Sequence, residues 1–353
     1  MTLSREYGES RVAVNVKDSA SESLREYPTI LDDNSGGAAA VAALSAGLPV
    51  AVGLHITKCA GTSLMTTVRR LLPDGQYYMC SSYYENLLAG RNVFANYVTT
   101  DDIIFMFGHF IHESLVAYFQ KRPLYLFTGL REPVMRAASH LAQINTTRFR
   151  GAQPLLTAEE FLGEKLNGMC DEILRAFPSV AEDIEGGKFE KARGVLSMFD
   201  YIYDSSHINA QADHILAVVE LAGHPLQPDN VTDKKVLDPD LVEFNRQQTG
   251  LLTEMAPQAL ADDIELYAAF QGQFGIGELN IRLADEPWAI PREKLFAKFP
   301  DPSAARRQFN AWEAKHFVYE FYLLGKLPEF KAALDERLGS VNQLLQEAVI
   351  YGV

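Results

Sequence analysis

The feature that most constrains the fold is a strand-to-helix turn at residues 55–63, His-Ile-Thr-Lys-Cys-Ala-Gly-Thr-Ser. The apolar run 49–54 before it has the composition of a buried strand, and the residues after it follow a helical pattern. This order is typical of α/β proteins with a parallel sheet. The unpaired N–H groups at such a helix start, together with Lys58, predict a site for an anion such as phosphate.

A second strand-to-helix unit lies at residues 124–141. Residues 124–128 predict a buried strand, and Pro133 stands where the first turn of a helix tolerates proline. Arg131 lies at the strand exit, and Ser139 lies about two turns into the helix, roughly 10 Å further on. An extended Arg side chain and this hydroxyl can reach one phosphate, to which Arg can donate two parallel hydrogen bonds.

A third predicted strand, 103–107, ends in Gly108-His109-Phe110. In open α/β sheets, ligands and catalytic groups gather beyond the carboxyl ends of the strands, where we expect His109. An imidazole that titrates near neutrality suits a general base. Alternatively, His109 is only hydrogen-bonded at a strand end. The nearby His112 and Glu113 are further candidates for the base, or for the partner that orients the base.

These motifs resemble those of a known enzyme family. The loop is not a Walker A loop, because Lys58 precedes Gly61 by three residues and no Lys stands directly before the hydroxyls. His-x-x-Lys-x-x-Gly-Thr-Ser-Leu resembles the 5′-phosphosulfate loop of sulfotransferases that use 3′-phosphoadenosine 5′-phosphosulfate (PAPS). The resemblance is to the carbohydrate branch, which includes heparan sulfate 2-O-sulfotransferases and related bacterial proteins. That branch usually has Pro where this chain has Thr57.

The two other motifs extend the resemblance. Leu-Arg-Glu-Pro-Val-x-Arg-x-x-Ser-His is similar to the family's 3′-phosphate motif, and Gly-His-Phe is similar to the position of its catalytic base. The resemblance implies a P-loop-like parallel sheet flanked by helices. It also implies in-line transfer of a sulfuryl group from PAPS to a hydroxyl, or an amine, of a small-molecule or carbohydrate acceptor.

The resemblance also implies a set of site residues. The catalytic residues are His109 and Lys58. The cofactor-binding residues are Lys58, Cys59, Ala60, Gly61, Thr62, Ser63, Arg131 and Ser139, with Lys234 and Lys235 in a loop that closes over PAPS. The expected acceptor contacts are His112, Glu113 and His140. No metal is expected.

The domain organisation follows from the extent of the resemblance, which covers residues 48–275. A further strand over 199–204 and a helix over 207–222 belong to this PAPS-binding domain. Residues 1–47 are expected to be an arm or linker. Residues 276–353 are expected to form a helical extension packed on the domain, with helices over 303–325 and 327–350. Their apolar stripes predict core packing, with a substrate lid or a homodimer contact as alternatives.

Composition narrows the choice of partners. The chain has 32 Lys and Arg against 46 Asp and Glu, a net charge of −14. This charge disfavours nucleic acid and anionic polysaccharide and favours a small neutral or cationic acceptor. Three cysteines without paired spacing predict neither a disulfide framework nor a zinc site. The uncharged stretch 35–57 is rich in Ala and Gly, so we expect a linker and strand instead of a membrane span, in a cytoplasmic protein.

Two other functions stay open. A P-loop kinase acting on a small molecule would need a Lys directly before the hydroxyl and ligands for Mg²⁺. A non-catalytic nucleotide-binding protein would keep the loop without the chemistry.

Overall fold

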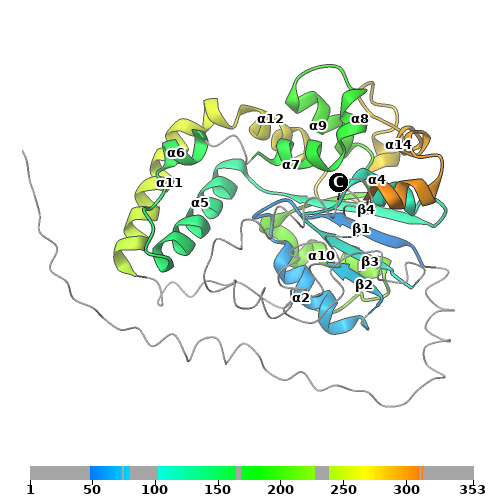
Figure 1. Ribbon diagram of the computed structural model, residues 1–353, viewed down its shortest axis with the longest axis horizontal. Helices are drawn as coiled ribbons and strands as arrows, with labels where there is room; N and C mark the ends of the chain where they lie inside the picture. Colours follow the sequence, from blue (N-terminus) through cyan, green and yellow to red (C-terminus); the bar gives the residue numbers. More distant parts are fainter. Residues whose placement is uncertain are drawn as a thin grey trace, which may run out of the picture. The chain divides into compact units, whose positions relative to one another are not determined.

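A computed structural model describes residues 48–73, 75–79, 102–163, 168–226, 238–309 and 312. These residues form an α/β domain around a five-stranded, all-parallel sheet with strand order β2-β3-β1-β4-β5 (Figure 1). The strands are β1 (Val50–Leu54), β2 (Tyr77–Met79), β3 (Phe105–Gly108), β4 (Leu124–Leu130) and β5 (Tyr201–Asp204). The predicted α/β class, a parallel sheet flanked by helices, is confirmed.

Both faces of the sheet are covered. All five residues of β1 are buried, as expected for a central parallel strand. Because side chains alternate along a strand, Val50, Val52 and Leu54 pack into one apolar cluster while Ala51 packs into another on the opposite face. The near-continuous apolar runs that predicted strands in the sequence therefore reflect burial from two sides.

The helices form three groups (Figure 1). On the face of Ala51 lie α2 (Gly61–Leu71) and α10 (Ile208–Val218), which directly follows the short 3₁₀ turn η2 (Ser205–His207). On the other face lie α4 (Glu113–Tyr118), α7 (Met169–Ala176), α8 (Pro178–Glu182), α9 (Lys188–Leu196), α12 (Ala261–Phe270), α13 (Leu279–Arg282) and α14 (Arg292–Lys298). The third group, α5 (Pro133–Arg150), α6 (Ala158–Gly163) and α11 (Pro239–Ala259), packs around its own apolar cluster.

The described part of the C-terminal segment belongs to the same core as the sheet. Leu279, Leu295 and Phe309 share the apolar cluster of Val52. Arg292 ties the segment to the strands, because its guanidinium pairs with Asp200 at 2.7 Å. The predictions for residues 1–47 and for the helices beyond Trp312 lie outside the described residues. No helix in the described ranges is both long and apolar enough to cross a membrane.

The carboxyl ends of β3, β1, β4 and β5 lie at one edge of the sheet, where β4 and β5 extend two residues beyond β1 and β3. Leu54, the last residue of β1, is in register with Gly108 of β3 and Thr128 of β4, and Leu130 is in register with Asp204 of β5. Within the sheet, β2 and β3 lie on one side of strand β1, whereas β4 and β5 lie on its other side. Ligands in open α/β sheets bind at such a reversal of strand order.

Candidate functional site

A cavity of about 430 Å³ lies beyond these strand ends. It is lined by His55, Thr57, Lys58, Ala60, Thr62, Ser63, His109, Arg131, Ser139, Gln143, Ser205 and Ser206. Lys58 follows β1, His109 follows β3 and Arg131 follows β4. The fold thus brings the residues singled out in three separate motifs to one cavity.

The loop between β1 and α2 has an unusual backbone. Lys58 and Ala60 are left-handed, with φ of 68° and 61°, a conformation that is uncommon for residues other than glycine. Turns that contain such residues can direct successive N–H groups into an anion-binding concavity. Helix α2 begins next to this turn with no side-chain cap and no acidic residue in its first turn, so its partial positive charge is not offset locally.

Side chains from other elements hold three successive carbonyl groups of the loop. Arg136 donates to Thr57 O at 3.2 Å, Arg131 donates to Lys58 O at 3.1 Å, and the Tyr203 hydroxyl donates to Cys59 O at 3.1 Å. In a trans peptide the N–H points opposite to the C=O. The N–H groups of Lys58 and Ala60 therefore point away from Arg136 and Tyr203.

Gly61 is required at the start of α2 by a close approach. A Cβ at this position would lie 2.5 Å from Cδ2 of His55 and 2.6 Å from Cε1 of Phe107. The His55 ring occupies the space beneath the helix start, so that ring and glycine together set how closely the loop packs on β3.

The electrostatics of the cavity favour an anion. Burial, and then the nearby Arg131 guanidinium, lower the pKa of Lys58 from its usual value. In the described part of the chain neither Lys58 nor Arg131 forms an ion pair with a carboxylate, and no acidic residue lines the cavity. Two cations brought together without a carboxylate leave an excess of positive charge that a phosphate or sulfate group would neutralise.

His109 is held in a defined tautomer. Its Nδ1 lies 2.6 Å from the carbonyl oxygen of His55, and since a carbonyl only accepts, Nδ1 carries the hydrogen. In the neutral ring the lone pair is then on Nε2, the atom that can take up a proton. The His55 ring stacks on His109 with centroids 4.1 Å apart. Burial, then His109 and Lys58, lower the pKa of His55 well below its usual value, so His55 is neutral near neutral pH.

The structure does not bring His112 and Glu113 to this cavity. His112 is the N-cap of α4 and accepts a hydrogen bond from the Ser114 N–H at 3.3 Å. Glu113 is 1% exposed and accepts from the Ser179 N–H at 3.0 Å, at the start of α8. Both side chains stabilise helix N-termini. Lys234 and Lys235 lie outside the described residues.

Cys59 is buried within the loop instead of facing the cavity. Burial raises the pKa of its thiol to about 12, so the thiolate needed for nucleophilic chemistry does not form near neutral pH. Its contribution to the loop is the carbonyl group that Tyr203 holds.

His140 is not among the residues that line the cavity, and it packs edge-on against Phe161, with ring centroids 5.6 Å apart. Its Nδ1 is buried without a hydrogen-bond partner. Burial, and then the Arg136 charge, lower its pKa to about 4. His140 is therefore a neutral packing residue near neutral pH, and it is not among the residues that could contact an acceptor in this cavity.

A pH prediction follows from His140. Its folded-state pKa lies below the unfolded value near 6.5, so its contribution to stability is present above pH 6.5 and is lost as pH falls toward 4. We expect the free energy of unfolding, measured in urea, to fall less between pH 6.5 and 4 in His140→Gln than in the wild type. A smaller slope remains, because the pKa of His55 is shifted in the same direction. His224→Gln, at an exposed position, is the control; equal slopes in His140→Gln and wild type would contradict the assignment.

Five residues that line the cavity were not predicted as site residues. Two of them, His55 and Thr57, belong to the predicted loop, and the other three lie outside the motifs. Gln143 follows Ser139 by four residues and therefore lies on the same face of α5, a spacing that could have revealed it. Ser205 and Ser206 directly follow β5, so their signal was a pair of hydroxyls at a predicted strand exit. They add neutral hydrogen-bonding groups to the wall contributed by β5.

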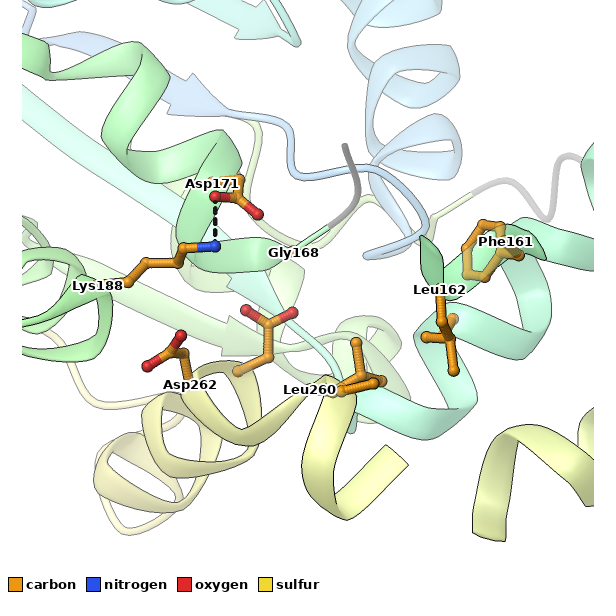
Figure 2. A pocket seen from close by; sticks show the side chains of 10 residues that line it. Phe161, Leu162, Gly168, Asp171, Lys188, Leu260 and Asp262 are labelled. Atoms are coloured by element: carbon orange, nitrogen blue, oxygen red, sulfur yellow. Dashed lines mark ion pairs between the residues drawn. The ribbon is translucent and has the colours of Figure 1, made fainter. Parts of the chain in front are cut away.

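A larger cavity, of about 510 Å³, has the opposite character (Figure 2). Its lining includes Asp171, Asp262 and Asp263, and its only lining cation in the described part of the chain, Lys188, pairs with Asp171 at 2.8 Å. Carboxylates at this density would repel phosphate. The smaller cavity is therefore the candidate anion site.

Within the described ranges, no group of three or more His, Cys, Asp or Glu is arranged to hold a metal ion. No protein-family model matches the chain, and no curated protein matches it either.

Proposed function

We propose that this protein is a PAPS-dependent sulfotransferase with a P-loop-like anion site. The observation that carries the proposal is that Lys58, Arg131, Ser139 and His109 line one cavity, although they come from three different loops and a helix. Two phosphate-binding positions and a base are what sulfuryl transfer from a doubly phosphorylated nucleotide needs.

The cavity suits a nucleotide in size and chemistry. Its volume of about 430 Å³ lies within the range of roughly 300–1,000 Å³ typical of small-molecule sites. Its lining supplies cations, hydroxyls and an amide, with no acidic side chain. These are the groups that bind phosphate oxygens.

The cavity would bind both phosphates of the nucleotide. The N–H groups of the loop and of the start of α2, together with Lys58, would hold the 5′-phosphosulfate. Arg131 and Ser139 would hold the 3′-phosphate, which distinguishes PAPS from ATP. When bound, PAPS supplies a sulfuryl group attached to a phosphate leaving group, and Lys58 would stabilise the negative charge that builds on that phosphate.

His109 would act as the general base. Its Nε2 would accept the proton that the acceptor hydroxyl loses as it attacks sulfur. The hydrogen bond from Nδ1 to the His55 carbonyl keeps the ring in the tautomer that this role requires. The net charge of −14 favours a small neutral or cationic acceptor.

The first test is ligand binding. We expect the wild type to bind 3′-phosphoadenosine 5′-phosphate more tightly than ATP in calorimetry, and to transfer radiolabelled sulfate from PAPS to a metabolite mixture. Tighter binding of ATP would favour a small-molecule kinase. Binding without transfer would favour a non-catalytic nucleotide-binding protein.

Arg131→Ala tests the 3′-phosphate position. Hydrogen bonds to charged groups contribute about 1.5–3 kcal/mol, so we expect roughly 10–100-fold weaker binding of 3′-phosphoadenosine 5′-phosphate. Binding of AMP, which has no 3′-phosphate, should weaken less, because for AMP only the hydrogen bond from Arg131 to the Lys58 carbonyl is lost. The matched control is Arg246→Ala, because the exposed Arg246 guanidinium lies on α11 and pairs with Glu243. An equal loss for both nucleotides would contradict the assignment of Arg131.

A further inference from the structure

Thr57, the residue before Lys58, is bound by a carboxylate from a distant helix. Its backbone N–H donates to Oε2 of Glu172 at 2.9 Å, and its hydroxyl donates to the same oxygen at 3.1 Å. Glu172 lies on α7 and is only 5% exposed. One buried carboxylate therefore holds two polar groups of the loop.

The third polar group of Thr57 is held by Arg136. This side chain is 1% exposed and donates to the Thr57 carbonyl at 3.2 Å. It lies 3.5 Å from Glu172 and 3.8 Å from Asp263. Every hydrogen-bonding group of Thr57 thus has a partner in one buried charged cluster.

Asp263 anchors this cluster to the rest of the fold. Its carboxylate accepts from the N–H groups of Met169 at 2.8 Å and Cys170 at 3.0 Å, at the start of α7. Asp263 lies on α12, Glu172 on α7 and Arg136 on α5. The cluster therefore connects the loop to three helices, none of which is adjacent to the loop in the sequence.

Such a cluster is better suited to fixing geometry than to adding stability. Buried ion pairs lose most of their Coulombic gain to desolvation, and apolar residues of similar volume often stabilise as well or better. The cluster binds Thr57, the residue that precedes Lys58. The backbone of Lys58 is left-handed, a conformation that persists only where surrounding contacts enforce it.

We propose that Glu172 and Arg136 are positioning residues that fix Thr57, and through it the backbone of Lys58, in the anion-binding conformation, with Asp263 orienting Arg136. The catalytic consequence of this inference rests on the proposed sulfotransferase function. The structural consequence does not, since it concerns the conformation of the loop itself.

The experiment compares four variants of the full chain. Glu172→Met removes the acceptor at similar side-chain size, Thr57→Val removes only the hydroxyl bond, and Thr57→Ser keeps both bonds. Asp171→Asn is the matched control, because Asp171 is the neighbouring acid on α7 and pairs with Lys188 at the larger cavity (Figure 2). Amide hydrogen exchange of residues 57–60 is measured alongside turnover and the affinity for 3′-phosphoadenosine 5′-phosphate.

We expect Glu172→Met to speed exchange in the loop at least about tenfold while α2 and α7 keep their protection. Thr57→Val should show a smaller change in the same amides, and Thr57→Ser and Asp171→Asn should match the wild type. Since displacing a reacting group by about 1 Å can cost roughly 10²-fold in rate, kcat should fall about 10–100-fold in Glu172→Met.

Unchanged loop protection in Glu172→Met would overturn the positioning role. If Glu172→Met does not fold, the Thr57 pair decides: equal loop exchange in Thr57→Val and Thr57→Ser would also overturn it. Failure of the wild type to bind 3′-phosphoadenosine 5′-phosphate would instead contradict the proposed function, and the exchange data would still decide the role of the cluster.

Discussion

Lys58→Met is expected to lower sulfuryl-transfer turnover by about 10²–10³-fold or more, while the variant is at least as stable as the wild type. The loss follows because Lys58 would be a preorganised donor to the negative charge that builds on the leaving phosphate, and removing one such donor costs this much. Stability should not fall, because burial and Arg131 both disfavour the charged form of Lys58 in the folded protein. Methionine keeps the apolar stem of the side chain.

The measurements are turnover with radiolabelled PAPS and urea unfolding. Lys188→Met is the matched control, because Lys188 has the opposite environment: a hydrogen bond to Asp171 raises its pKa. We expect Lys188→Met to keep its activity and to lose at most about 1 kcal/mol, the usual contribution of a surface ion pair. A Lys58→Met variant that is active, or that is strongly destabilised, would refute the assigned role.

His109→Gln is expected to lower turnover by about 10²–10⁴-fold, the typical contribution of a general base. The glutamine side-chain amide can still donate to the His55 carbonyl, so the loop should keep its shape, but it cannot take up a proton. Affinity for 3′-phosphoadenosine 5′-phosphate should be nearly unchanged, since His109 would act on the acceptor and not on the nucleotide.

This separation of binding from rate is what calorimetry and initial-rate kinetics would measure together. His224→Gln, at an exposed position, should behave as the wild type in both. Wild-type turnover in His109→Gln would show that another group takes the proton. A loss of nucleotide affinity as large as the loss of rate would show that His109 belongs to the nucleotide site.

The strand-to-helix units were predictable because their signals are local. The apolar run before residue 55 and the helical spacing after it correspond to β1 and α2, and Pro133 stands at the start of α5 as predicted. The predicted third strand, 103–107, is displaced by only two residues from the start of β3 at Phe105. The convergence of Lys58, His109 and Arg131 then follows from parallel strands whose carboxyl ends share one edge.

Other features depended on contacts that no local pattern contains. Glu172 is 115 residues from Thr57, and Tyr203 is 144 residues from Cys59. The side chains of His112 and Glu113 suit catalysis and helix capping equally well. Only the positions of the helices show which of the two roles each residue has. The long helix α11 was not predicted, and Gly250 and Pro257 interrupt its helical pattern.

The three carbonyl contacts of the loop have a consequence for how the protein folds. Arg136, Arg131 and Tyr203 are separated in sequence from their partners by 79, 73 and 144 residues. Contacts of such long range require large parts of the chain to be ordered first. The loop can therefore acquire its final shape only late, after β1, β4 and β5 have docked, and a partly folded chain should not capture phosphate. Phosphate binding, followed during refolding, would then measure the fraction of chains that have folded completely.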